Sequence, residues 1–442
     1  MTAPTARRGF TEEAVTELIA RRAEPDWMRA RRLDAWNTYQ QIPMPTRFDE
    51  EWRRTDLRNL KLDDVQPFGE VHPTSGGSLV PEAEREEQMA GFLGLQDGRP
   101  VEYRLDDSLK AKGVIFTDLA TAVREHGDLI REYFMTRCVP ASDGKFAALH
   151  GAFWENGAFL YVPRGVTVEL PFRTIVASSL DGTASLAHTL IVLDEGSQAT
   201  FAEDFTSPTA QRAGFSTRVT ELILKQGANL HYVGVQRWGR KVNDFHTERV
   251  LLGRDSTVTL QTVEFGSQLS KGRVEAILQG DGASAKLLGL YLEDGTQHFD
   301  RYTLQDHNAS SGMSDLLFKG VVTDKARSVF SGLIRVSPDG KKTAAYQQNR
   351  NLLLSRTARA DSIPNLEIGC NDIVGCSHGA TVGKVDEEQL FYLMCRGLNR
   401  AEATQLIVEG FVDPLVEAVP ILPLRAALRA EISARVRGRE AD

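Results

Sequence analysis

Cys376 and His378 stand two residues apart in the stretch GCSHGATVG, residues 375–383. On a β-strand, residues i and i+2 project from the same face, so the thiol and the imidazole would lie side by side. A thiolate beside an imidazole suits soft or borderline metals, iron and zinc among them. The same pair could act as a nucleophile with its base, or be a buried cysteine beside a hydrogen-bonded histidine. The residues by themselves leave these three interpretations open.

Other cysteines and histidines are weaker candidates. Cys370 would share the face of Cys376 if one strand ran through both, but the intervening residues NDIVG are typical of a break. We expect Cys138 and Cys395 to be core thiols and His307 to end a strand at a turn. No C-x-x-C pair and no G-x-x-x-x-G-K-[ST] loop occurs in the sequence. A complete active site within this one chain is therefore not expected.

The composition is typical of a globular protein with two or three structural units. The chain has 442 residues, 41% of them hydrophobic, and a net charge of −8. This charge argues against a general nucleic-acid binder, which needs a basic face. There is no run of about 18 apolar residues to span a membrane, no apolar core of a secretion signal, and no disulfide scaffold among four scattered cysteines. We therefore expect a cytoplasmic protein.

The middle of the chain, roughly residues 155–365, consists of short apolar runs separated by similar turns. The turn residues recur at intervals of 31, 31, 28 and 27, at Gly165, Gly196, Gly227, Asp255 and Gly282. Near-regular spacing of strand–turn–strand units predicts a β-solenoid, with two coils in each repeat, in preference to a β-sandwich.

The N-terminal region has a helical pattern over residues 1–60, with Thr11 as a predicted N-cap. One apolar face is predicted from residues spaced by three: Trp27, Ala30, Leu33 and Trp36. Residues 70–90 are polar and rich in Gly and Pro, which is typical of a loop or linker.

The C-terminal region, residues 386–442, is again helical in pattern. Asp386 is predicted to cap a helix that stops at Gly397, and Asn399 with Glu402 has the layout of a capping box. The last helix carries an apolar stripe at i+4 spacing: Leu424, Leu428, Ile432 and Val436. Such a helix needs a groove, either in this chain or on a partner.

Three stretches resemble the SufB/SufD scaffold family of the SUF iron–sulfur cluster assembly system. They are TDKARSVFSGLIRV (323–336), QQNRNLLLS (347–355) and the run from Leu366 to Phe411, which contains the Cys376–His378 pair. The resemblance implies a mainly β fold, a right-handed parallel β-helix flanked by N-terminal and C-terminal α-helical regions. It divides the chain into an N-terminal helical region with a polar linker (1–150), a β-helix core domain (151–372), and a C-terminal signature strand with a helical domain (373–442).

Within that family the chain is more similar to the SufD type than to the SufB type. SufB-like chains carry a cysteine at the position that aligns with Asn349 and a glutamate at the position of Gly379. The N-terminal stretch EEWRRTDLRNL (50–60) also looks like the SufD form.

The resemblance implies a scaffold subunit and not a stand-alone enzyme. Such a chain pairs with a SufB-like chain through the β-helices and docks the ABC-type ATPase SufC on its C-terminal helical domain, forming a SufBCD complex without a nucleic-acid or membrane partner. Cys376 and His378 would then face the interface and hold iron or a nascent iron–sulfur cluster transiently. Further ligands would come from the partner chain, and no cofactor is expected to stay bound to this chain alone.

Three alternatives stay open at the level of the sequence. The chain could form a homodimeric β-helix scaffold, or it could be an enzyme whose cysteine nucleophile is Cys376. A carbohydrate-active β-helix enzyme is the third, although no row of aligned carboxylates along one groove is evident in the sequence.

Overall fold

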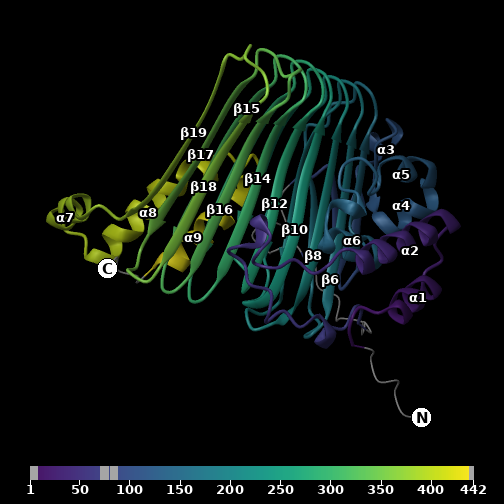
Figure 1. Ribbon diagram of the computed structural model, residues 1–442, viewed down its shortest axis with the longest axis horizontal. Coiled ribbons are helices and arrows are strands. Elements are labelled where there is room, and N and C mark those ends of the chain that lie inside the picture. The colour runs from purple at the N-terminus through teal and green to yellow at the C-terminus, as the bar shows by residue number, and fades with distance from the viewer. Residues whose placement is uncertain (1–7, 70–78, 80–87, 438–442) are drawn as a thin grey trace, which may run out of the picture.

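A parallel β-solenoid dominates the computed structural model, which describes residues 8–69, 79 and 88–437 (Figure 1). The chain winds through about eight turns, and each turn adds one strand to each of two sheets. Helices flank the solenoid on the N-terminal and C-terminal sides of the sequence. This arrangement confirms the predicted mainly β fold with flanking helical regions.

From β4 onward, successive strands along the chain alternate between the two sheets. The first sheet contains β1 (Gly91–Gln96), β2 (Arg99–Leu105), β5 (Phe172–Ala177), β7 (Gln198–Thr206), β9 (Asn229–Arg237), β11 (Thr257–Glu264), β13 (Ser284–Glu293), β15 (Met313–Val322), β17 (Ala344–Leu353) and β19 (Gly375–Lys384). The second contains β3 (Ile115–Asp118), β4 (Ala158–Val162), β6 (Ala184–Leu193), β8 (Ala213–Leu224), β10 (Lys241–Leu252), β12 (Leu269–Leu278), β14 (His298–His307), β16 (Arg327–Val336) and β18 (Arg359–Ile368). Only the β1–β2 and β3–β4 pairs among these strands are antiparallel.

Left-handed corner residues explain the periodicity of the sequence. Gly196, Gly227 and Gly282 have φ angles of 64°, 66° and 72°, and Asp255 has a φ of 53°, so the predicted turn residues are confirmed. Asn229 on β9 pairs with Thr257 on β11, 28 residues later. One coil therefore accounts for each repeat, and the prediction of two coils was wrong because strands such as β10, with 12 residues, are long.

Apolar side chains from the two inner faces fill most of the space between the sheets. The first sheet contributes Phe172, Phe201, Leu230, Leu260, Leu287 and Leu316, and the second contributes Leu222, Val250, Ala276 and Phe330. Removal of these side chains from water is the main source of stability for a solenoid.

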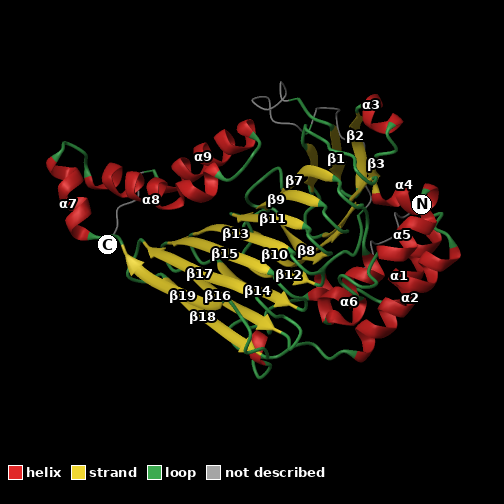
Figure 2. Cartoon of the chain, turned by 90° about the horizontal axis from the view of Figure 1, so that it is seen from above, coloured by secondary structure: helices red, strands yellow, loops and turns green. Residues whose placement is uncertain are grey.

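The N-terminal helices cover the outer face of the second sheet (Figure 2). They are α1 (Glu12–Arg21), α2 (Asp26–Gln41), α4 (Leu119–Glu125), α5 (Gly127–Tyr133) and α6 (Lys145–Phe153). The short helix α3 (Asp107–Ala111) lies beside β2 instead, and its Leu109 packs into the core between the sheets. Thr11 caps α1, as predicted, by accepting a hydrogen bond from the backbone N–H of Ala14. Phe146 on α6 stacks on Phe245 of β10, 3.8 Å between ring centres. The range 1–150 also contains β1, β2 and β3, which the sequence did not predict.

The predicted apolar face of α2 was wrong at Ala30 and Leu33, which are exposed, and right at Trp36. The buried side chains are Met28, Arg32, Ala35 and Trp36, whereas Leu33 is 43% exposed. Arg32 lies inside because its guanidinium pairs with Glu24 at 2.6 Å and donates to the carbonyl of Trp154 at 3.0 Å. The buried face of α2 therefore contains a charged side chain, which a search for apolar residues at regular spacing does not find.

Helices α8 (Arg400–Glu417) and α9 (Leu422–Val436) pack on the outer face of the first sheet. Gln261 of β11 donates to the carbonyl of Leu415, and Lys319 of β15 donates to the carbonyl of Phe411. The predicted stripe Leu424, Leu428, Ile432 and Val436 is buried, so its groove lies in this chain. The capping box of Asn399 with Glu402 is confirmed at the start of α8.

Helix α7 (Glu387–Cys395) extends away from the sheets (Figures 1 and 2). Asp386 caps it as predicted, accepting from the N–H of Glu388. Phe391 is 70% exposed and Cys395 is exposed as well, so the prediction of a core thiol at Cys395 was wrong. The helical spacing suggested a buried face, but no element of the described chain covers that face.

Two further expectations concern membranes and the linker. None of the helices in the described ranges combines the length and the apolarity that a membrane crossing requires. The predicted linker over 70–90 falls outside the described residues, apart from residues 79 and 88–90.

The solenoid interior also contains carboxylates. One of them, Glu203 on β7, is hydrogen-bonded to two hydroxyl groups. It is fully buried, accepts a hydrogen bond from the Thr189 hydroxyl at 2.6 Å, and accepts another from the Tyr232 hydroxyl at 3.2 Å. Burial raises the pKa of Glu203 to about 7 because the charged form loses its hydration. At pH values between the ordinary pKa of a glutamate and about 7, Glu203 is therefore protonated in the folded state and ionised in the unfolded state.

Replacement of Glu203 by Gln tests this assignment. Glu203 contributes stability that is complete below its unfolded pKa and is lost as the pH rises through about 7. We expect Glu203→Gln to gain roughly 2 kcal/mol of unfolding free energy relative to wild type between about pH 5 and about pH 8. Urea unfolding at both pH values measures the difference. Glu169→Gln, at an exposed position, is the matched control, and an equal pH response in both variants would contradict the assignment.

Candidate functional site

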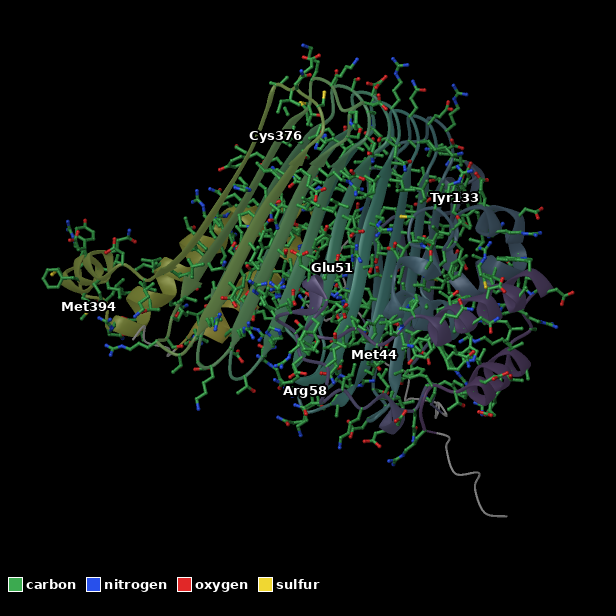
Figure 3. The ribbon with its side chains drawn as sticks, in the orientation of Figure 1. Met44, Glu51, Arg58, Tyr133, Cys376 and Met394 are labelled. Carbon is green, nitrogen blue, oxygen red and sulfur yellow. The ribbon has the colours of Figure 1, made fainter. Side chains whose placement is uncertain are left out.

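Cys376 and His378 lie on β19, the last strand of the first sheet. β19 pairs only with β17, and β18 at the end of the second sheet pairs only with β16, so the described chain leaves the final coil open. Figure 3 labels Cys376 on this edge strand. The site therefore lies where the solenoid stops and the next coil would begin.

The thiol and the imidazole face the space between the two sheets. Cys376 pairs in register with Ala345 of β17, and His378 pairs with Gln347. Both β17 residues are buried, whereas Tyr346 between them is 41% exposed, so the inner face of β17 continues into Cys376 and His378. Cys376 is half-buried and His378 is exposed, because no further coil covers them. The predicted placement of the pair on one strand face is confirmed, and its chemical role stays a prediction.

Small residues keep this end of β19 open. A Cβ atom added at Gly375 would meet nothing within 4 Å, and one at Gly379 would meet only the Tyr346 hydroxyl, at 3.8 Å. Residues 369–374 form the loop that joins β18 to β19, which confirms the predicted break between Cys370 and Cys376. Both thiols nevertheless pack against one small cluster, Ile334, Val336 and Ala345.

Partial burial changes the acidity of the thiol. Desolvation raises the pKa of Cys376 above its ordinary value, and a backbone hydrogen bond involving Ala345 opposes this only in part. The sulfur therefore carries its proton at neutral pH. A soft metal can bind there only by displacing that proton, since the thiolate is the metal ligand.

Cys376 and His378 supply two ligands, which is not a complete set. A tetrahedral site for iron or zinc needs four. Only one group of three metal-type side chains in the described part of the chain has ligand atoms within 4.8 Å of one another, namely Asp244, His246 and Glu264. Cys376 and His378 do not belong to it. Any metal held by the pair therefore takes its remaining ligands from elsewhere.

The group of Asp244, His246 and Glu264 lies inside the solenoid and was missed by the sequence reasoning. The two imidazole nitrogens of His246 lie 3.1 Å from Asp244 and 3.5 Å from Glu264. Arg218 pairs with Asp244 at 2.8 Å, and Arg301 pairs with Glu264 at 2.5 Å. Since the carboxylates are already compensated, this is an ionic core network and not a vacant metal site. The alternation in DFHTE, residues 244–248, was the available signal.

A chain of polar contacts, one cation–π contact followed by hydrogen bonds, runs from this network to the open end. The ring of Tyr291 lies 3.6 Å from the guanidinium carbon of Arg301, and its hydroxyl donates to Asn351 at 2.7 Å. Asn349 donates to the Tyr291 hydroxyl at 2.9 Å and accepts from Ser362 on β18 at 2.8 Å. The polar interior is therefore continuous up to the coil that precedes Cys376 and His378.

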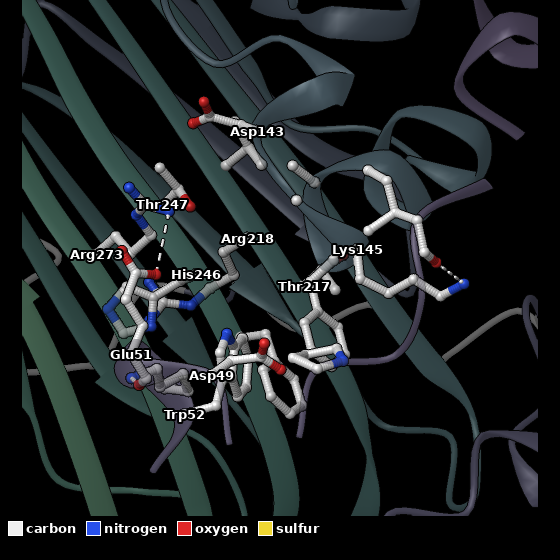
Figure 4. A pocket seen from close by; sticks show the side chains of 18 of the residues that line it. Asp49, Glu51, Trp52, Asp143, Lys145, Thr217, Arg218, His246, Thr247 and Arg273 are labelled. Carbon is white, nitrogen blue, oxygen red and sulfur yellow. Dashed lines mark hydrogen bonds and ion pairs between the residues drawn. The ribbon is translucent and has the colours of Figure 1, made fainter. Parts of the chain in front are cut away.

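A cavity of about 430 Å³ lies elsewhere, between residues 42–52 and the outer face of the second sheet (Figure 4). Trp52 and Phe245 contribute its aromatic wall. Lys145 donates to the carbonyl of Ile42 at 2.8 Å, and Lys271 donates to the carbonyl of Glu51 at 2.7 Å. Both lysines are thus engaged in fastening the N-terminal segment, and the cavity is a packing feature of that attachment.

Comparison with known proteins identifies two matching family models. The SufBD core domain of SUF system FeS cluster assembly matches residues 175–411, a range that includes Cys376 and His378, and the SufBD protein N-terminal region matches residues 101–174. An iron–sulfur cluster assembly SufBD family protein of Staphylococcus epidermidis is 30% identical over 431 residues, covering 94% of this chain and 91% of its own length. The iron–sulfur cluster assembly protein SufB of Bacillus subtilis has the same identity and coverage.

The raised pKa of Cys376 leads to a pH-dependent reactivity. We expect iodoacetamide to modify Cys376 in the folded chain with a midpoint at higher pH than in the urea-unfolded chain, because only the thiolate reacts. Peptide mass spectrometry across a neutral-to-alkaline pH series measures both midpoints. A folded-state midpoint at or below the unfolded one would show that the surroundings stabilise the thiolate.

Proposed function

The chain belongs to the SufBD family of iron–sulfur cluster assembly proteins, and on that premise we propose that it is a SufD-type scaffold subunit of a SufBCD complex. It pairs through the open end of its solenoid with a SufB-like chain. Iron, or a nascent iron–sulfur cluster, is held at the shared end as cargo and not as a resident cofactor. The observation that carries this proposal is the inward-facing pair Cys376 and His378 on the open final strand.

The bare edges of β18 and β19 support end-to-end pairing. Each strand has ten residues and one hydrogen-bonded neighbour in the described chain, so one side of each backbone lacks a strand partner. Long uncovered edges attract a further strand. A partner solenoid that continues both sheets would bring its own terminal side chains over Cys376 and His378, and would complete a ligand set that this chain leaves at two.

The surroundings of Asn349 support the SufD type. Its amide is fully buried, donates to Tyr291 and to the carbonyl of Phe318, and accepts from Asn351 and Ser362. By resemblance, SufB-like chains carry a cysteine at this position. Here the position is part of the internal hydrogen-bond chain. A thiol at this position would therefore come from the SufB-like subunit of the complex and not from this chain.

Helix α7 is the part of the C-terminal domain that best fits the docking of the ATPase SufC. Phe391 and Tyr392 are 70% and 58% exposed, and Met394 is 41% exposed. An apolar and aromatic patch of this kind on an extended helix is typical of a protein interface. Helices α8 and α9 are fixed to the first sheet, so a force applied to α7 by ATP-driven movement would reach the solenoid through them.

Two alternatives use the same features. A homodimer would bring two copies of the open end together and supply Cys376 and His378 twice, which also gives four ligands. An enzyme with Cys376 as its nucleophile is disfavoured, because burial raises the thiol pKa where such an enzyme needs it lowered.

Removal of the metal ligands tests the site. We expect Cys376→Ser and His378→Ala to fold normally, because both side chains are at an uncovered end, and to lower cluster yield at least tenfold in the anaerobic complex with the SufB-like chain and the ATPase. Visible absorption and iron and sulfide content measure the yield. Ser377→Ala, between the two ligands and on the opposite strand face, is the control. Normal yield from both ligand variants would sink the assignment.

The ATPase interface is tested by Phe391→Glu. Deletion of the whole C-terminal region would uncover the apolar outer face of the first sheet, so a point change is the better probe. We expect this variant to lose the ATPase about tenfold or more in affinity while it retains the SufB-like partner. Anaerobic affinity purification from the native host, with mass spectrometry of the partners, measures both. Leu422→Glu, at an exposed position on α9, is the control, and full retention of the ATPase by Phe391→Glu would place the interface elsewhere.

A further inference from the structure

Gln347 lies directly beneath His378 in the solenoid. It belongs to β17, pairs in register with His378 of β19 and is fully buried. Neither its side-chain oxygen nor its side-chain nitrogen has a hydrogen-bond partner within the described chain. An unpaired buried amide is costly to a fold, so a specific one asks for an explanation.

The amide reaches across the interior to the opposite sheet. A Cβ atom added at Gly332 of β16 would lie 2.3 Å from the Nε2 atom of Gln347, so the bare glycine backbone makes room for it. In the preceding coil, the register partner of Gln347 is Leu316 of β15, which is buried and apolar. In the next coil toward the open end, the register partner of Gly332 is Pro364 of β18, which has no N–H group and no polar side chain. Thr303 of β14, the register partner of Gly332, is also buried with an unpaired hydroxyl, so it does not satisfy the amide. A further partner for the amide can come from the open end.

The neighbouring buried amide, that of Asn349, has its hydrogen-bond partners within the chain. Asn349, two residues along the same strand face, uses both of its amide hydrogen-bonding atoms. Gln347 and Asn349 share strand, face and burial, and differ in what lies above them: His378 above the first and Ala380 above the second. Of these two amides, the unpaired one lies next to a candidate metal ligand.

Resting on the function proposed above, we propose that Gln347 is a positioning residue of the site formed by Cys376 and His378. Its Nε2–H group donates a hydrogen bond to a sulfur or oxygen atom bound to the iron that these two residues hold. Donors of this kind orient the bound group and tune a metal centre, and hydrogen bonds to sulfur shift the properties of iron–sulfur species. The amide lacks a partner in the chain alone because its acceptor arrives with the cargo.

The test uses the full-length chain in its anaerobic complex with the SufB-like chain, with Co²⁺ as a spectroscopic probe for iron. A thiolate-to-cobalt absorption band that disappears in Cys376→Ala defines the site. We expect Gln347→Leu to weaken Co²⁺ binding about tenfold and to shift this band. Its thermal unfolding midpoint is expected to stay unchanged or to rise, because leucine removes an unpaired amide from the interior. Loss of binding together with retained or increased stability distinguishes a site residue from a structural one.

Two further variants sharpen the result. Gln348→Leu changes the adjacent glutamine, whose side chain is on the other strand face, and is expected to leave both the affinity and the band unchanged. Gly332→Ala keeps the amide but displaces it, since the added Cβ atom occupies its place. It is expected to weaken Co²⁺ binding in the same direction as Gln347→Leu.

Each outcome decides between specific statements. A Cys376-dependent band in wild type with unaltered affinity and band in Gln347→Leu would overturn the role of Gln347 and leave the proposed function in place. A lowered unfolding midpoint with unaltered binding would assign the amide to the fold. If wild type lacks a Cys376-dependent band, the metal site of the proposed function fails, and the role of Gln347 fails with it.

Discussion

In-register parallel pairing of one coil on the next is the constraint on which this structure depends. Every coil satisfies the backbone groups of its neighbour and passes on the same inward and outward alternation of side chains. The final coil has no successor within the described chain, so β18 and β19 keep one free edge each. The same rule therefore creates a stable body and an unfinished end. Cys376 and His378 are inward residues that the missing next coil would have buried.

The interior of the solenoid is unusually polar for a two-sheet core, and the way its charges are paired separates structure from function. Arg218, Arg301 and His246 are each matched by carboxylates, which fixes the neighbouring strands in register. These side chains already have partners and have little freedom to bind anything else. A bound group is instead expected where a buried polar group has no partner, as at Gln347, or where ligands are too few to complete a site, as at Cys376 and His378.

The C-terminal helices divide into two parts with different physical roles. The apolar side chains of α8 and α9 pack on the outer face of the first sheet, so these helices are fixed to the solenoid. Helix α7 keeps its aromatic side chains in solvent and has Arg400 of α8 paired with its Glu387 at 2.7 Å. One contact area at α7 and another at the open end would let two partners bind this chain at once.

The sequence by itself determined what depends on neighbours along the chain. Corner residues at regular intervals predicted the solenoid, Thr11, Asp386, Asn399 and Glu402 predicted the helix caps, and the i, i+2 spacing placed Cys376 and His378 on one face. Turns, caps and strand alternation arise within a few residues, so their signals are local.

Only the tertiary structure decided what depends on residues distant in the sequence. Arg32 lies on the buried face of α2 because Glu24 and Trp154 meet it there, and Cys395 proved exposed because no element of the described chain covers the face of α7 that carries it. The unpaired amide of Gln347 could not be predicted either, since its isolation depends on Leu316, Gly332 and Pro364 from three other strands. Burial and hydrogen-bond satisfaction are properties of the packed coils, and no local pattern encodes which coil is last.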